Sequence, residues 1–362
     1  MSIPAPPTCD NLPPESSDAV LAPNGKAARQ RINAEAHVSS KSLTLETGRS
    51  AVSVIDQLHQ RGSARIRFPN SSPDTLSAVL INTAGGLTGD DCMHWSAAAN
   101  TDSRLTLSTA ACEKLYRSHG PAAVQATNLQ VHANARLDWL PQETILFNGG
   151  SLNRTLNVQI DESATALVVE SLAMGRLAMD ETIDQLHLHD RWRLYRAGKL
   201  LHAEDLRLDI NSDSNTDSSI DSSIDSNSDS SCNSNIGSST KSSTDCISDN
   251  NTASSAKIST DCNAQQQSIL HHNGAVSTVV FVSPLSEEFL QNMAERVRKL
   301  IGETGIDEAG SADGTLTAAV TVLKHRLIIR TVARDSFCLR KFLIPCIERL
   351  SDGATIPPVW KV

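Results

Sequence analysis

The segment DSRLTLSTA at residues 102–110 places Leu105 and Leu107 between polar side chains, and similar short segments lie on both sides of it. Apolar residues at every second position, rich in Thr, Val and Ile and bounded by Gly, Asn or Pro, are typical of short β-strands. The other such segments are HVSSKSLTLETG (37–48), GSARIRFP (62–69), LSAVLIN (76–82) and RTLNVQI (154–160). The chain up to residue 210 is therefore predicted to be mostly β.

The C-terminal third predicts another strand, at AVSTVVFVSP, and then two helices. The first helix should begin with a cap at Ser283 and Pro284 and end at Gly302. The second should start near Ser336. A hairpin is predicted between them, from TLTAAVTVL (315–323) and RLIIRTVA (326–333). Strands followed by two late helices do not match the βα alternation of a doubly wound nucleotide-binding fold.

Two segments have the composition of disordered chain. Residues 1–36 are rich in Pro, Ala, Ser and Asn and are predicted to be a disordered extension. Residues 211–268 contain eight Asp and two Lys, with no Glu or Arg, so they carry −6 of the formal net charge of −9. Such a polar, serine-rich tract cannot bury enough apolar surface to fold. We therefore expect a single domain over 37–362, with the insertion forming an overgrown hairpin or another connection between strands.

Composition excludes several functional classes. No apolar run reaches the about 20 residues that span a bilayer, so no membrane segment is expected. The N-terminus lacks the basic start and apolar stretch of a secretory signal. The acidic balance argues against nucleic-acid binding. The eight cysteines form no C-x-x-C pair, which argues against zinc and redox sites and favours a cytoplasmic location.

The glycine-rich segment NTAGGLTGDD contains Gly85, Gly86 and Gly89. A phosphate-binding loop needs Lys and then Ser or Thr after its last glycine, whereas Asp90 and Asp91 follow here. Two carboxylates would repel a phosphate. The segment is therefore interpreted as a turn that joins two strands.

Several carboxylates lie in apolar sequence. Glu143 occurs in LPQETILF and Glu170 follows TALVV, and a buried carboxylate without a partner would be costly. Each is expected to have an arginine partner. The candidate partners are Arg117, Arg154 and Arg176. The functional alternative is that such carboxylates line an internal passage and hand on a divalent ion, with Glu181 as a third candidate.

His187, His189 and Asp190 form a second candidate site. In a strand the two histidines would share one face, as metal chelation requires, although a solvated strand edge explains the same pattern. No G-x-S-x-G, H-E-x-x-H or Walker motif occurs in the sequence. The residues alone therefore indicate a mostly-β protein with no recognisable catalytic apparatus.

The order of the motifs resembles the urease accessory protein family UreD, also called UreH. The segments that carry the resemblance are QRGSARIRFP, NTAGGLTGDD, LTLSTAACEKLYRS, LDWLPQETILFNGG, SLAMGRLAMDE and TVLKHRLIIRTVARDS. It covers about residues 36–210 and 268–362. The sequence departs from the family pattern at Asp90, where a further glycine is usual, and at Cys112, where alanine is usual. Two further departures are Asp180 and Pro358.

The resemblance implies a β-helix-like stack of short sheets with two α-helices near the C-terminus. It also implies a non-enzymatic role in urease maturation, in a complex with UreF, the GTPase UreG and the urease apoprotein. Nickel would be in transit and no cofactor would be permanently bound. Glu143, Glu170 and Glu181 become candidates for the nickel passage. The structural motif residues are Gly85, Gly86, Gly89, Asp91, Arg117 and Arg176.

Two alternatives remain open from the sequence. A β-rich hydrolase would use His187, His189 and Asp190, and the purified protein would show turnover that is lost when either histidine is removed. A metal-independent β-rich binding module would form complexes that do not respond to nickel.

Overall fold

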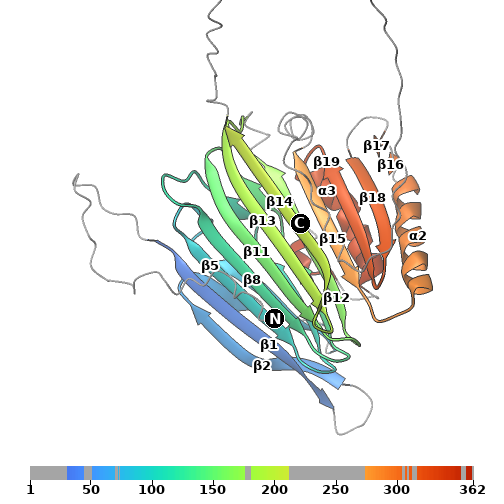
Figure 1. Cartoon of the computed structure of the whole chain (residues 1–362). Helices are drawn as coiled ribbons and strands as arrows, with labels where there is room; N and C mark the ends of the chain where they lie inside the picture. The colour runs from blue at the N-terminus through green and yellow to red at the C-terminus, as the bar shows by residue number, and fades with distance from the viewer. Residues whose placement is uncertain are drawn as a thin grey trace, which may run out of the picture.

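Two large β-sheets lie face to face and account for most of the residues that the structure describes (Figure 1). The computed structural model describes residues 31–44, 51–69, 72, 74–175, 181–211, 274–303, 306–307, 310–311, 316–351 and 356–360. In spatial order, the seven-stranded sheet contains β14 (Lys199–Asn211), β13 (Gln185–Arg196), β11 (Gly150–Ile160), β8 (Ala123–Val131), β5 (Cys92–Ala99), β1 (Asn33–Thr44) and β2 (Ala51–Arg61).

The second sheet has ten strands. Its main path runs through β18 (Leu316–Leu323), β19 (Arg326–Ala333), β15 (Ala275–Val282), β12 (Thr165–Met174), β9 (Arg136–Leu140), β6 (Arg104–Thr109), β4 (Leu76–Asn82) and β3 (Ala64–Arg67). A branch adds β10 (Thr144–Leu146), which pairs with β12, and β7 (Glu113–Leu115). The short strands β16 (Ile306–Asp307) and β17 (Gly310–Ser311) pair separately.

The central part of the chain coils between the two sheets. From β4 to β13 it passes repeatedly from one sheet to the other, so that β4, β6, β9 and β12 are parallel neighbours in one sheet. Their counterparts β5, β8, β11 and β13 are parallel neighbours in the other. Strand β1 extends the second array in parallel. Antiparallel strands then flank both arrays, and these are β2 and β14 in the seven-stranded sheet and β3 and β15 in the ten-stranded sheet. The predicted β-helix-like stack of sheets is confirmed.

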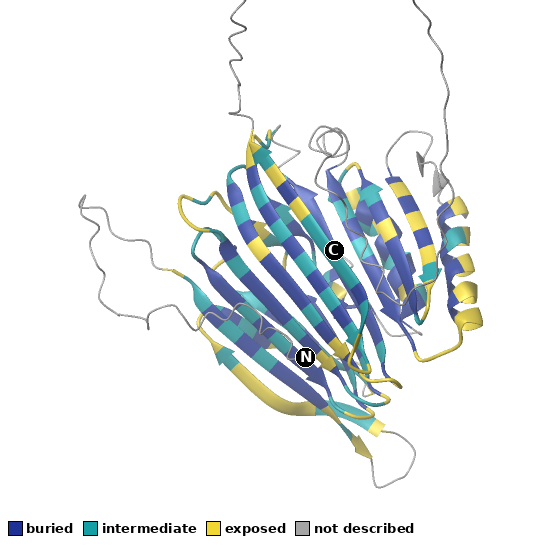
Figure 2. Ribbon diagram, in the orientation of Figure 1, coloured by how far each residue is buried: buried dark blue, intermediate teal, exposed yellow. Residues whose placement is uncertain are grey.

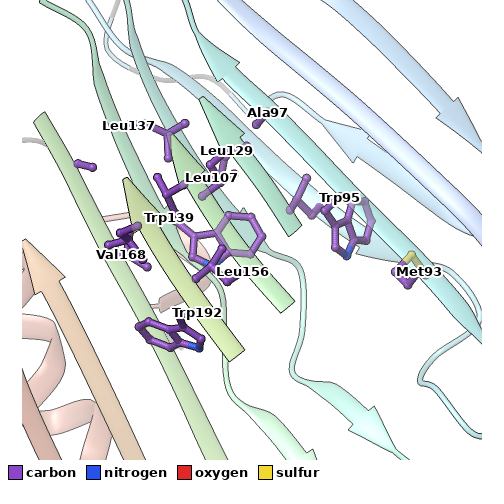
Figure 3. Packing of buried hydrophobic residues seen from close by; sticks show 14 of the residues in the cluster. Met93, Trp95, Ala97, Leu107, Leu129, Leu137, Trp139, Leu156, Val168 and Trp192 are labelled. Carbon is purple, nitrogen blue, oxygen red and sulfur yellow. The ribbon is translucent and has the colours of Figure 1, made fainter. Parts of the chain in front are cut away.

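The main hydrophobic core lies between the two sheets. Leu129 and Leu156 of the seven-stranded sheet meet Leu107, Leu137 and Val168 of the ten-stranded sheet (Figure 3). Three tryptophans also belong to this core, namely Trp95, Trp139 and Trp192. Because aromatic residues make up only 3% of the chain, aliphatic side chains supply most of the core.

A second core covers the opposite face of the ten-stranded sheet. Helix α2 (Glu287–Glu303) and helix α3 (Ser336–Leu350) pack there, followed by the short helix η3 (Pro358–Trp360). In β12, Val168 faces the core between the sheets while Val169 faces the helices. This burial on both faces explains the continuous apolar run TALVV. The outward side of α2 is exposed (Figure 2).

Most predicted elements are present, and the hairpin of β18 and β19 is among them. The first helix starts later than the sequence predicts. Ser286 caps α2, since its hydroxyl accepts a hydrogen bond from the Phe289 amide at 3.2 Å. Ser283 instead accepts one from the Leu285 amide at 3.2 Å, just beyond β15.

Two predictions about segment boundaries also need adjustment. Strand β1 begins at Asn33, so ordered structure starts before the predicted boundary at residue 37. The chain before and after the insertion does not form a hairpin, because β14 belongs to the seven-stranded sheet and β15 to the ten-stranded one. The insertion is thus a connection between sheets. Residues 212–273 lie outside the described part of the chain.

Candidate functional site

The glycine-rich loop joins β4 to β5, as the sequence predicts for a turn between strands. Its Leu87 pairs with β7, donating its amide to the Lys114 carbonyl at 2.7 Å and accepting from the Tyr116 amide at 2.8 Å. Gly86 has φ of +153°, and a Cβ there would lie 2.5 Å from the Tyr116 ring. The loop can approach β7 this closely only because that position has no side chain.

Of the two aspartates that end the loop, Asp91 holds the loop backbone with its side chain, and Asp90 has an unusual backbone conformation. Asp91 is 1% exposed and accepts hydrogen bonds from the Thr88 amide at 2.8 Å and the Ile32 amide at 3.0 Å. Asp90 has φ of +66°. That left-handed conformation favours glycine, which gives a physical reason for a glycine at this position in the family pattern. The role of Asp91 is therefore structural, because its carboxylate holds the loop in place.

Arg117 lies next to the same loop. Its carbonyl accepts a hydrogen bond from the Thr88 hydroxyl at 2.7 Å, and its side chain packs against Gly149, where a Cβ would lie 2.9 Å from the Arg117 Cγ. Glu143 has an arginine partner, as expected, but that partner is Arg340 and none of the three named candidates. Arg176 lies outside the described residues.

A buried charged cluster connects the two sheets. Arg154 of β11, only 4% exposed, donates from Nε and Nη2 to the Asp190 carboxylate at 3.0 and 2.6 Å. Its Nη1 donates to Glu170 Oε2 at 2.7 Å and to the Thr144 hydroxyl at 3.2 Å. Asp190 lies directly opposite Arg154 on β13, whereas Glu170 lies across the core on β12. The expected arginine partner of Glu170 is therefore Arg154.

The cluster contains two carboxyl groups and one guanidinium. Trp139 Nε1 donates to Glu170 Oε1 at 2.8 Å, and Trp192 Nε1 donates to Asp190 Oδ2 at 3.2 Å. Burial raises the pKa of Glu170, and the nearby charge of Arg154 only partly opposes that effect. If all three groups were ionised, the cluster would carry an excess of one negative charge. A cation beside Glu170 would therefore be stabilised.

A cavity of about 140 Å³ leads to this cluster. Its exposed lining includes Gly85 and Lys114, and its buried lining includes Arg154, Glu170 and Gln125. Gln125 is 9% exposed, and its Oε1 has no hydrogen-bond partner among the described residues. The cavity therefore combines a carboxylate and an unsatisfied carbonyl oxygen at its buried end, and both are suitable ligands for a hydrated cation.

Glu113 is a cavity residue that the sequence analysis did not identify. Both its carboxylate oxygens accept from Asn82 Nδ2, at 3.2 and 3.3 Å, and the same amide donates to the Gly86 carbonyl at 3.2 Å. Burial raises the pKa of Glu113 to about 7. Its position within the motif LTLSTAACEKLYRS was the available signal, but its polar neighbours gave no reason to single it out.

Glu143 connects the coil to α3 and does not line the cavity. Its carboxylate, in a residue 1% exposed, accepts from Arg340 Nε at 2.6 Å and Nη2 at 2.5 Å. The Cys112 thiol lies 3.3 Å from Glu143 Oε2, and burial raises the pKa of that thiol to about 11. Burial alone would raise the pKa of Glu143, but the hydrogen bonds and charge of Arg340 outweigh it and lower that pKa.

We expect Glu143→Gln to lower the free energy of unfolding by about 1–3 kcal/mol at neutral pH, because a charge-assisted pair is lost. The folded-state pKa of Glu143 lies below its usual 4.5, so this stabilisation is present above pH 4.5 and lost as the pH falls further. Urea denaturation across that range would measure it. Glu35→Gln is the matched control, since the Glu35–Arg61 pair is exposed. A penalty that does not change with pH would contradict the assignment.

Glu181 lies apart from both Glu143 and Glu170. Its Oε1 accepts a hydrogen bond from the Asn148 amide at 3.1 Å, at the margin of the segment that follows β12. It is absent from the cavity lining. The three predicted passage carboxylates are therefore not side by side, and Glu170 alone faces the cavity.

The three candidate hydrolase residues do not lie together either. His187 and His189 share the outer face of β13, as predicted, and pair with Asp209 at 2.5 Å and Asp205 at 3.0 Å. Asp190 points into the core toward Arg154. No three His, Cys, Asp or Glu side chains among the described residues form a cluster that could hold a metal ion.

Comparisons with known proteins agree with these features. The sequence model of the UreD urease accessory protein family matches residues 39–222. A urease accessory protein UreD of Rhizobium leguminosarum bv. viciae is 36% identical over 333 residues, covering 92% of this chain and 96% of its own. UreD proteins of Rhizobium rhizogenes and Chelativorans sp. are 34% and 33% identical, with 92% and 93% of this chain covered and 96% of each relative.

The matched family and the fold define an accessory protein of an enzyme, built as a coil of stacked sheets. More specifically, the chain belongs to the UreD urease accessory protein family and has a role in urease maturation. In the described part of the chain, no helix is long and apolar enough to cross a membrane.

Proposed function

We propose that this chain delivers nickel to the urease apoprotein in the cytoplasm, in a complex with UreF and the GTPase UreG. In this role it is a metallochaperone scaffold that performs no catalysis and holds nickel only in transit. Family membership supports a part in maturation, and the cavity supports a passage for a cation.

The observation that carries the proposal is the buried end of the cavity. Glu170 lines it and belongs to a cluster with one carboxyl group more than its single guanidinium. Gln125 lines the same cavity, and its Oε1 has no hydrogen-bond partner among the described residues. Oxygen ligands in a site with excess negative charge favour a divalent cation. Glu143 and Glu181 remain passage candidates from the sequence, but their positions favour Glu170.

Deletion of this gene alone in cells that carry a urease gene cluster should leave urease protein that accumulates but is nearly inactive and poor in nickel. Urease activity, urease abundance and bound nickel would be measured on the same samples. Reintroducing the chain should restore both activity and nickel content. Full, nickel-replete activity without the chain would overturn the proposal.

Among alanine variants, Glu170→Ala should lower urease activation severalfold more than Glu143→Ala or Glu181→Ala, because Glu170 is the one of these three that lines the cavity. Co-purification of each variant with urease would show whether the complex still forms. The isosteric Glu170→Gln separates loss of charge from loss of packing. Unchanged activation in all three alanine variants would exclude these carboxylates from the passage.

A further inference from the structure

The guanidinium of Arg154 lies in the buried lining of the cavity, beside Glu170. Arg154 and Glu170 both line the cavity, whereas Asp190 does not. The guanidinium binds Glu170 on one side and Asp190 on the other, so it separates the cavity from Asp190. A cation that reached Glu170 would meet a fixed positive charge at that point.

The guanidinium of Arg154 binds Asp190 and Glu170 with unequal hydrogen bonding. Asp190 accepts two hydrogen bonds from the guanidinium, at 3.0 and 2.6 Å, and this bidentate geometry is the stronger arrangement. Glu170 accepts one, at 2.7 Å, and the Thr144 hydroxyl accepts a longer one at 3.2 Å from the same nitrogen. The contact with Glu170 can therefore be lost while Arg154 stays anchored to Asp190.

Both carboxyl groups keep other hydrogen bonds if that contact is lost. Trp139 donates to Glu170 and Trp192 donates to Asp190, so neither carboxylate depends on Arg154 alone for its position. The cluster has two carboxyl groups for one guanidinium, so with both of them ionised Glu170 could exchange the guanidinium for another cation without leaving a carboxylate uncompensated. The contact between Arg154 and Glu170 can therefore be replaced by a contact between Glu170 and another cation.

We propose that Arg154 is the gate of the cavity: it holds Glu170 when no cation is present and releases it, while remaining on Asp190, when a divalent cation arrives. This inference rests on the proposed function, because it assigns a regulating residue to the same passage. Arg154 acts through Glu170 and is therefore a positioning residue.

The test follows nickel in a complex of the full chain with the urease apoprotein, after addition of nickel chloride. The amount of nickel bound to urease is measured against time. Asp190→Asn weakens the bidentate anchor and should make the guanidinium favour Glu170, so nickel arrival should slow severalfold. Thr144→Val removes only the weaker contact on the Glu170 side and should make arrival faster.

A charge-balanced variant removes the gate without changing the charge of the cluster. Arg154→Gln combined with Asp190→Asn deletes one positive and one negative group, and nickel arrival should be at least as fast as in the original protein. The matched control is Arg136→Gln combined with Asp138→Asn, which alters a buried pair with a 3.0 Å contact away from the cavity. That control should leave nickel arrival unchanged.

The possible results distinguish the proposed gate at Arg154 from the proposed nickel passage past Glu170. A purely structural role of the cluster predicts that Asp190→Asn and Thr144→Val act in the same direction or not at all, and that result would overturn the gate. If Glu170→Gln still slows nickel arrival in that case, the passage stands without a gate. If Glu170→Gln also has no effect, the proposed route itself fails.

Discussion

Arg154→Met is expected to lower the free energy of unfolding by about 3–5 kcal/mol at neutral pH, because it leaves Glu170 and Asp190 buried without their cation. A loss of that size would unfold a large fraction of a marginally stable protein. Urea denaturation of the purified chain, or of its complex if the chain alone is insoluble, would measure the loss.

The pH dependence of this penalty has a definite sign. Burial already raises the pKa of Glu170, so the folded state takes up a proton at a higher pH than the unfolded state does. Without Arg154 both carboxyl groups lose their favourable charge partner. The penalty should therefore be largest at neutral and higher pH and should shrink as the pH falls toward the usual carboxyl range.

The control for Arg154→Met replaces all three charged groups. Arg154→Met, Glu170→Leu and Asp190→Leu together leave no uncompensated charge, and the indole groups of Trp139 and Trp192 lose their acceptors. Because apolar replacements of buried ion clusters are often neutral, this triple variant should be more stable than Arg154→Met alone. A triple variant less stable than the single one would show that packing, and not charge, dominates at this position.

Gly86→Ala should destabilise the protein by about 2–4 kcal/mol, combining a conformation almost restricted to glycine with a steric clash. The added Cβ would lie 2.5 Å from the Tyr116 ring and 2.6 Å from the Lys114 carbonyl oxygen. The loop would have to move away from β7, which would also displace Gly85 at the exposed part of the cavity. Urease activation should fall together with stability.

Gly198→Ala is the matched control for that substitution. Gly198 has φ of +73° in the turn between β13 and β14, but a Cβ added there would have no atom within 4 Å beyond its chain neighbours. Only the left-handed conformation is penalised at this position, by about 1–2 kcal/mol. Equal losses for the two variants would mean that contact with Tyr116 and Lys114 does not fix the loop.

Local sequence patterns predicted the strands and helices because they depend on short-range periodicity. The alternation in β6 is readable from a few neighbouring residues, and α3 starts at Ser336, as predicted. The start of α2 was missed because Ser283 and Ser286 are both acceptable caps and both accept local amides. Only the packing of α2 on the ten-stranded sheet decides between them.

The candidate site could be predicted from the sequence only in part. The apolar surroundings of Glu170 correctly indicated burial with an arginine, since an isolated charge there would be too costly. Nothing local distinguished Arg154 from Arg117 as its partner. Glu143 was assigned to the same functional group as Glu170, but Arg340, 197 residues further along the chain, holds it at α3.

The sequence by itself determined the strand-rich fold class, the late helices, the turn at the glycine motif and the family, because these depend on local periodicity and on the order of motifs. The tertiary structure alone decided which charges meet. Coiling between two sheets brings β10, β11, β12 and β13 together, so Thr144, Glu170 and Asp190 become neighbours of Arg154 although they lie 10 to 36 residues from it in the chain. Such contacts depend on strand register and sheet packing, which no short segment encodes.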